Sequence, residues 1–201
     1  VAPNCIGDDV IIYSKGADTV NGGEGNDWIN FSTTSAINVN LSLGVYKITS
    51  SGKVVESFIS NIENIVATNS ADIITGDDAN NTFITKSGND VVDGGLGVDT
   101  VNYSQASSVN ADLSTGTAIK KLSSGTFTDT LKNIENLVGS AFNDSLIGNN
   151  VSNVLSGGAG DDTLDGKSGI DTADFSTAHK AISVILHALS FSVYTSEKSP
   201  N

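Results

Sequence analysis

The stretch GGEGNDWIN at residues 22–30 shows the unit from which this chain is built. Its glycines allow a tight turn whose carbonyl groups point inward, because glycine adopts backbone angles that side chains forbid. Asp27 adds a carboxylate to those oxygens, and Ile29 is the single inward residue of a very short strand. The same pattern returns as GGLGVD at 94–99 and GGAGDD at 157–162. The stretch therefore predicts a repeated loop, carboxylate and buried residue.

The unit recurs every nine residues. Its sixth position is Asp or Asn throughout, and the residue two places later is always apolar. Two registers held together in this way favour a repeat architecture over turns in an ordinary β-protein. The sixth positions are Asp9, Asp18, Asp27, Asp72, Asn81, Asp90, Asp99, Asp144, Asn153, Asp162 and Asp171, and the apolar positions are Ile11, Val20, Ile29, Ile74, Phe83, Val92, Val101, Leu146, Leu155, Leu164 and Ala173.

A longer period of 72 residues encloses the short one, since Asp27, Asp99 and Asp171 share this spacing, as do the triplets IEN at 62–64 and 134–136. It divides the chain into repeat blocks and β-rich inserts. Because 72 is four times eighteen, each insert should return the chain to the same side of one common roll. The blocks are 1–30, 62–102 and 134–175, the inserts are 31–61 and 103–133, and 176–201 is a capping or tail segment.

The inserts contain β-strand patterns. In the first, INVNLSL at 37–43 alternates like a strand, SSGK at 50–53 predicts a turn and VVESFI at 54–59 a returning strand. VNADLS and the turn SSGT at 123–126 repeat this plan in the second insert. The tail stretch at 181–195 predicts a strand pair or a cap.

The composition narrows the classes of function. The net charge is −13 and the acidic residues are mostly Asp, which disfavours nucleic acid or an anionic membrane surface and favours cations. The one cysteine, Cys5, gives no disulfide framework and no zinc pattern. No apolar run reaches the length of a membrane span. There is no HExxH or GxSxG motif, and His179 and His187 are expected to be ordinary tail residues, so we expect no enzyme activity.

Stacked sixth-position carboxylates indicate calcium. If two nonapeptides form one eighteen-residue coil, residues eighteen apart lie about 4.7–4.9 Å apart in the stack, and facing carboxylates repel. A cation midway removes the repulsion, and calcium–oxygen bonds of about 2.3–2.6 Å fit that spacing. Magnesium requires a stricter octahedron, and zinc prefers Cys and His ligands. The stacked pairs are Asp9 with Asp27, Asp72 with Asp90, Asn81 with Asp99, Asp144 with Asp162, and Asn153 with Asp171, which predicts about five ions.

GGEGNDWIN, GGLGVDTVN and GGAGDDTLD resemble the repeats-in-toxin (RTX) nonapeptide, and residues 133–166 resemble the β-roll of serralysin-type metalloproteases. The resemblance covers most of 1–30, 61–103 and 133–175. It implies that each calcium ion lies between loops on the same side of the roll, held by sixth-position carboxylates and by carbonyls of the glycine-rich positions.

The predicted calcium ligands combine the phase argument with this resemblance. Asn81 and Asn153 stand where the pattern has Asp. For Glu63 and Glu135 a capping hydrogen bond is favoured over calcium ligation, which stays open as the alternative. The predicted ligands are Asp9, Asp18, Gly22, Gly23, Gly25, Asp27, Asp72, Gly88, Asp90, Gly94, Gly95, Gly97, Asp99, Asp144, Gly157, Gly158, Gly160, Asp162, Gly169 and Asp171.

The expected fold is all-β, a parallel β-roll with eighteen residues per coil. The expected function is a calcium-binding module that folds on binding extracellular calcium. As the resemblance implies, it would belong to a larger protein, with flanking domains, that is secreted or displayed on the cell surface through type I secretion machinery. Two alternatives remain: a calcium-stiffened structural or adhesive array of a cell-surface protein, and an accessory module of an extracellular hydrolase.

Overall fold

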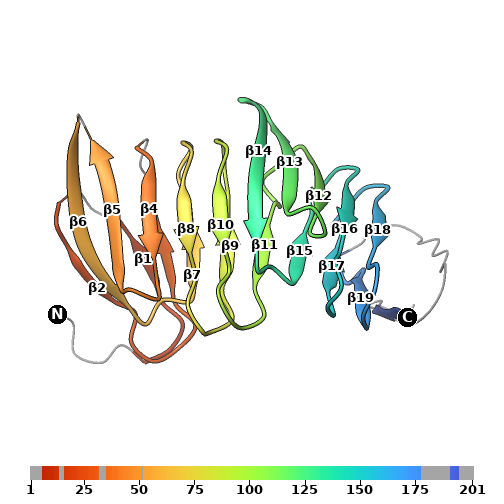
Figure 1. The fold of residues 1–201 in the computed structure, drawn as a ribbon, viewed down its shortest axis with the longest axis horizontal. Helices are drawn as coiled ribbons and strands as arrows, with labels where there is room; N and C mark the ends of the chain where they lie inside the picture. The colour runs from red at the N-terminus through yellow and green to blue at the C-terminus, as the bar shows by residue number, and fades with distance from the viewer. Residues whose placement is uncertain (1–5, 14–15, 32–34, 51, 178–190, 195–201) are drawn as a thin grey trace, which may run out of the picture.

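The protein is a parallel β-roll in which two sheets face each other (Figure 1). The computed structural model describes residues 6–13, 16–31, 35–50, 52–177 and 191–194. These residues form strands and turns only, so the all-β prediction is confirmed. Within them there is accordingly no helix that could cross a membrane. Cys5, His179, His187 and most of the predicted tail strands lie outside the described residues.

The first sheet has nine strands, and all its pairings are parallel. Ile11 lies beside Ile29, and Phe83 beside Val101, so residues eighteen apart are neighbours. In order across the sheet, the strands are β1 (Val10–Ile12), β3 (Trp28–Asn30), β7 (Asn64–Val66), β9 (Thr82–Ile84), β11 (Thr100–Asn102), β15 (Asn136–Val138), β17 (Val154–Ser156), β19 (Asp171–Asp174) and β20 (Phe191–Tyr194).

The second sheet has eleven strands and mixes parallel and antiparallel pairs. In order, they are β18 (Thr163–Asp165), β16 (Ser145–Ile147), β12 (Ser108–Asp112), β13 (Thr117–Leu122), β14 (Gly125–Lys132), β10 (Val91–Asp93), β8 (Ile73–Thr75), β4 (Ile37–Asn40), β5 (Val45–Ser50), β6 (Lys53–Ser60) and β2 (Thr19–Asn21).

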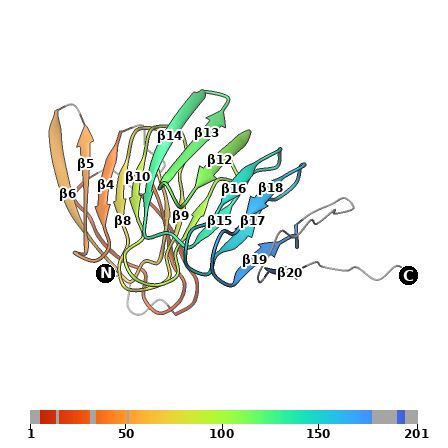
Figure 2. The same ribbon diagram turned by 45° about the vertical axis from the view of Figure 1, so that its right-hand side comes forward.

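Each insert is a three-stranded antiparallel meander built into the second sheet, β4–β5–β6 and β12–β13–β14. Meanwhile the strands on either side of an insert pair directly in the first sheet: Ile29 lies beside Ile65, and Val101 beside Leu137. The second sheet therefore gains strands that the first does not, and its strands spread like a fan (Figure 2).

The sequence pattern missed one strand in each insert. INVNLSL was expected to be one strand, but β4 ends at Asn40 and a turn follows at 41–44. Gly44 ends this turn with φ of 66°, and Gly116 does the same in the second insert with φ of 68°. Both values lie in the left-handed region, which glycine adopts without steric cost, and a further strand begins after each.

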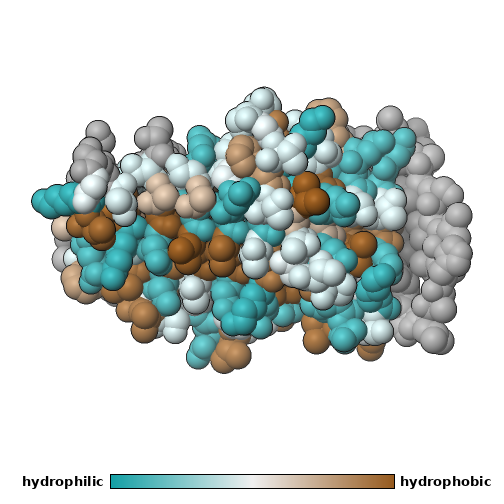
Figure 3. Space-filling view, turned by 45° about the horizontal axis from the view of Figure 1, so that its top comes forward, coloured by the Kyte–Doolittle hydropathy of each residue, from teal (hydrophilic) through white to brown (hydrophobic). Residues whose placement is uncertain are grey.

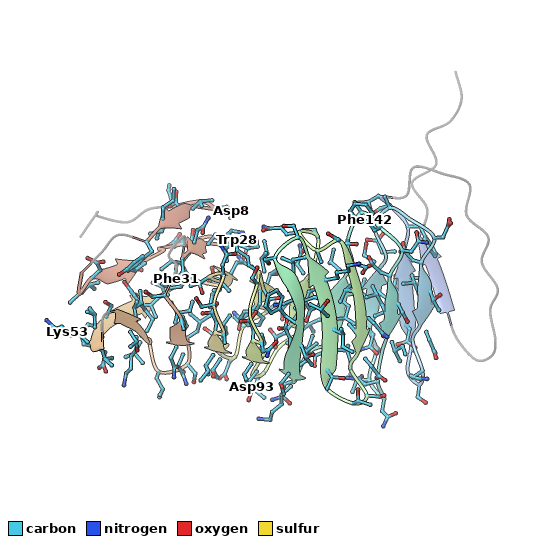
Figure 4. All side chains as sticks on the ribbon, turned by 90° about the horizontal axis from the view of Figure 1, so that it is seen from above. Asp8, Trp28, Phe31, Lys53, Asp93 and Phe142 are labelled. Atoms are coloured by element: carbon cyan, nitrogen blue, oxygen red, sulfur yellow. The ribbon has the colours of Figure 1, made fainter. Side chains whose placement is uncertain are left out.

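The core lies between the two sheets and is built mainly from one side chain of each short strand, in two rows along the roll. The central residue of each short strand points inward, and in the middle of the roll it is fully buried, as at Phe83 and Val92. Ile11, Val20 and Leu164 are only partly buried because they lie in coils near the ends of the roll. Figure 4 shows Phe31 between the two layers and Trp28 and Asp93 on their outer sides. On the face in Figure 3, apolar side chains are scattered among polar ones.

Candidate calcium sites

A ladder of hydrogen bonds joins sixth-position residues in loops on the same side of the roll. The backbone N–H of Asp9 donates to Oδ1 of Asp27 at 2.7 Å, and that of Asn81 donates to Oδ1 of Asp99 at 2.8 Å. Each sixth-position carboxylate is thus fixed by the coil before it, and its Oδ2 atom is left for other partners. The same bond joins Asp72 to Asp90, Asp144 to Asp162 and Asn153 to Asp171.

Because glycine has no side chain, further oxygen atoms can approach the carboxylates at the glycine positions. A Cβ atom on Gly94 would overlap both Oδ2 of Asp99 and the carbonyl oxygen of Asn133. Gly22 has the equivalent relation to Asp27 and Asn61. The first glycine of the sextet therefore provides a cradle in which a carboxylate oxygen meets a carbonyl oxygen of the next coil.

The later glycines of the sextets bring the preceding coil close. Gly95 and Gly97 have φ of 101° and 102°, and Cβ atoms there would overlap the carbonyl groups of Asp77 and Ala79. Both the backbone angle and the close approach require glycine. The loops consequently present carbonyl oxygens, which are ligands that calcium accepts.

Among the residues that the structure describes, two buried carboxylate oxygens have no hydrogen-bond partner: Oδ2 of Asp27 and Oδ2 of Asp99. Both side chains are buried, and a buried charge without a partner is strongly unfavourable. Burial raises the pKa of the Asp99 carboxyl to about 6, and the nearby Glu135, Asp77 and Asp93 carboxylates add to the rise. Oxygen ligands that carry excess negative charge are suited to binding a calcium ion.

Glu63 and Glu135 close these two sites from the following coil. Oε2 of Glu63 accepts the backbone N–H of Asp27 at 2.8 Å, and Oε2 of Glu135 accepts that of Asp99 at 2.8 Å. The predicted capping hydrogen bond is thus present. The turn before each glutamate is shorter than a sextet and begins at Asn61 or Asn133, each with φ of 50°. Because glutamate is longer than aspartate, it reaches the ladder position from this shorter turn.

Asparagine amides fill two other loops. Nδ2 of Asn81 donates to the carbonyl oxygen of Glu63 at 3.1 Å and to Oδ1 of Asp77 at 3.2 Å. Nδ2 of Asn153 donates to the carbonyl oxygen of Glu135 at 2.7 Å and to Oδ1 of Asn149 at 3.3 Å. In these loops the amide N–H group of asparagine, and not a carboxylate oxygen, faces the surrounding oxygens.

Asp72 and Asp144 are surrounded by protein donors. Asp72 accepts bonds from the backbone N–H of Thr68 at 2.8 Å, from the Thr68 hydroxyl and from the backbone N–H of Ile37 at 2.9 Å. Asp144 accepts the equivalent bonds from Ser140 and Val109. Burial raises the pKa of both carboxyl groups, and these hydrogen bonds oppose the rise.

Asp90 contacts a cation that belongs to the protein itself. Nζ of Lys120 lies 2.6 Å from Oδ2 of Asp90 and 2.8 Å from Oδ2 of Asp129. All three side chains are fully buried. Burial raises the pKa of Asp90 to about 7, and Asp129 adds to the rise while Lys120 opposes it. The nonapeptide pattern did not reveal Lys120 or Asp129, because both belong to the insert.

Asp162 and Asp165 differ in environment although they are three residues apart. A Cβ atom on Gly157 would overlap Oδ2 of Asp162, as one on Gly94 would overlap Oδ2 of Asp99. Burial raises the pKa of the Asp162 carboxyl. Asp165 forms an exposed ion pair with Lys167 at 2.8 Å.

No three His, Cys, Asp or Glu side chains form a metal cluster anywhere in the part of the chain that the structure describes. Any ion here would take most of its ligands from carbonyl groups, as the loops provide. Comparison with known protein families gives a match to the RTX calcium-binding nonapeptide repeat (4 copies), at residues 6–32, 62–103 and 138–173. The chain belongs to the RTX calcium-binding repeat family. The matched segments cover more than half of it and leave out most of both inserts. No curated protein matches the chain.

RTX membership confirms the resemblance seen in the sextets and makes the chain a calcium-binding repeat module. The matched segments contain the loops of Asp27, Asp99 and Asp162. They contain Asp90 but not Lys120 or Asp129, so two of the three members of the buried ion cluster lie outside the RTX repeat.

Proposed function

We propose that this RTX module is largely unfolded without calcium and folds when it binds extracellular calcium, as part of a larger protein secreted by a type I route. The observation that carries the proposal is the pair of buried, unpartnered oxygens on Asp27 and Asp99. The Glu63 and Glu135 carboxylates, each bonded to one backbone N–H, bring further negative charge to these two oxygens. Bound calcium would neutralise this charge and link consecutive coils. The module itself would have no catalytic role.

The calcium-binding residues would lie first at the three full sextets, with carboxylates from Asp27, Asp99 and Asp162 and carbonyls from the glycine positions. Glu63 and Glu135 would contribute to the first two sites. The other predicted ligands stay proposals of second rank, and protein donors already contact the carboxylates of Asp72, Asp144 and Asp90. These ligands are Asp9, Asp18, Asp72, Gly88, Asp90, Asp144, Gly169 and Asp171.

The core is thin, because each short strand points only its central residue inward, so the proposal assigns part of the folding free energy to calcium. Extracellular calcium modules bind with dissociation constants of about 10⁻⁴–10⁻³ M. At a calcium concentration ten times the dissociation constant, each site adds about 1.4 kcal/mol of stability. The predicted five sites would together add about 7 kcal/mol, which is comparable with the whole folding free energy of a domain, about 5–15 kcal/mol.

Calcium titration calorimetry on single variants tests the proposal. Asp99→Asn keeps the Oδ1 acceptor for Asn81 but removes the charge, and it should lose one calcium site or weaken it about tenfold or more. Asp78→Asn is the matched control, because it removes the same charge from an exposed loop residue. Equal calcium binding by both variants and the wild type would refute the site.

A further inference from the structure

A buried ion cluster joins the second repeat block to the second insert. Lys120 comes from β13, Asp129 from β14, and Asp90 from the loop before β10. The ammonium contacts Oδ2 of both carboxylates, and the hydroxyl of Thr85 donates to Oδ2 of Asp129 at 3.1 Å. Side-chain exposure is 0% for all three charged residues, so water does not neutralise them.

Asp129 occupies a place in the ladder of sixth-position residues. The backbone N–H of Asp90 donates to Oδ1 of Asp129 at 2.9 Å, just as that of Asp72 donates to Oδ1 of Asp90 at 2.9 Å. Asp129 therefore does for the insert what a sixth-position Asp does for a repeat loop. Nζ of Lys120 lies between the Oδ2 atoms of two consecutive ladder carboxylates, which is the position where the stacking argument places a cation.

In the first insert, 72 residues earlier, neutral residues replace the lysine and one aspartate, while Asp18 keeps the place of Asp90. Ser57 takes the place of Asp129, and its hydroxyl accepts the backbone N–H of Asp18 at 3.0 Å. Ile48 takes the place of Lys120, and the large Tyr46 takes the place of Ala118, where both Tyr46 and Ala118 are fully buried. The small Ala118 leaves room for a lysine side chain, so the second insert differs from the first by a coordinated set of residues.

We propose that the ammonium of Lys120 is a tethered cation that replaces calcium at this joint, so that β8, β10, β13 and β14 stay paired when calcium is removed. The inference deepens the proposed function and rests on it in one respect: calcium independence here has meaning only if other coils depend on calcium. Removal of one partner from a buried ion pair is strongly destabilising, because the remaining charges stay buried. The joint would then be the folded centre to which calcium-dependent coils add.

Amide hydrogen exchange on the full 201-residue chain, in calcium and in chelator, tests this directly. In the wild type, amides of β10 and β14 should keep their protection in chelator, whereas those of β3 and β18, which follow full sextets, should lose it. Lys120→Ala should lower the protection of β10 and β14 in chelator by about 100-fold or more. Lys121→Ala, which removes the same charge from the exposed neighbour, should leave it unchanged.

The outcomes separate the two proposals. Wild-type β10 and β14 that lose protection on chelation as fully as β3 and β18 would overturn the inference, and this comparison requires no variant. Equal protection of Lys120→Ala and Lys121→Ala in chelator would overturn it too. If no strand of the wild type responds to calcium, the proposed function fails, and the two lysine variants still decide whether Lys120 holds the joint.

Discussion

The backbone N–H of Asp99 donates a hydrogen bond to Oε2 of Glu135 at 2.8 Å, across 36 residues and an entire insert. The bond joins the best-formed sextet of the second block to the first turn of the third block. It also brings a second carboxylate to the unpartnered Oδ2 atom of Asp99. A single glutamate thus joins two blocks and adds negative charge to a candidate calcium site.

Glu135→Gln separates these two roles. The amide oxygen still accepts the Asp99 N–H, so exchange protection at Asp99 in saturating calcium should be preserved, while calcium affinity should fall about tenfold. Glu56→Gln, at an exposed residue paired with Lys47, is the control. Calorimetry measures the affinity, and an affinity equal to that of the control would show that Glu135 only caps the coil.

Asp162→Ala and Asp165→Ala separate a calcium ligand from mere charge. Asp162→Ala should lower the melting temperature of the calcium-loaded protein by about 5–10 °C, because the loss of one or two sites costs a few kcal/mol. Asp165→Ala breaks only an exposed ion pair and should cost about 0–1 kcal/mol. In chelator the order should reverse, since the first change relieves repulsion between Asp162 and Asp144. Identical calcium responses in thermal melts would refute the nine-residue phase.

Gly94→Ala should abolish calcium binding at its loop, because the new methyl group would overlap Oδ2 of Asp99 and the carbonyl oxygen of Asn133. Gly52→Ala is the comparison: its φ is 76° and its surroundings are open, so it should cost about 1 kcal/mol from backbone strain alone. Calorimetry and thermal melts measure both effects. A Gly94→Ala protein with wild-type calcium affinity would show that the cradle holds no ion.

The calcium-free protein should be more stable at pH 5 than at pH 7. The pKa of Asp99 in the folded chain is raised to about 6, above its ordinary value of 3.8. The folded state therefore holds this proton more tightly than the unfolded state, and the resulting stability disappears as the pH rises through 6. Melts in metal-free buffer should show the fall, and Asp99→Asn should reduce it. A melting temperature that rises from pH 5 to pH 7 would contradict this.

The sequence predicted the repeating part well, because each nonapeptide has one function per position. Asp at the sixth position and an apolar residue two places later are local requirements, and the structure buries Ile29, Phe83 and Val101 accordingly. Gly44, directly after the predicted strand at 37–43, was the local signal for a turn and a further strand. A glycine with left-handed backbone angles marks a turn between two strands here, just as such glycines mark the turns of the sextets.

The sequence pattern did not predict the buried Lys120, for a different reason. Its partners come from another strand and another block, and a lysine in an alternating strand is usually a solvent-facing residue. The comparison that exposes it is between the two inserts, where Lys120 and Asp129 replace Ile48 and Ser57 together. A charge pair that appears jointly at aligned buried positions indicates an internal ion pair, whereas each residue alone does not.

Calcium titration of the whole chain, followed by circular dichroism and amide hydrogen exchange together, tests the account most directly. In chelator the β-sheet signal should fall to a minor part of its full value, and the residual protection should be confined to β8, β10, β13 and β14. Calcium at millimolar concentration should restore the signal and protect the strands that follow the full sextets. A chelated protein that keeps its full spectrum, its melting temperature and the protection of β3 and β18 would contradict calcium-coupled folding.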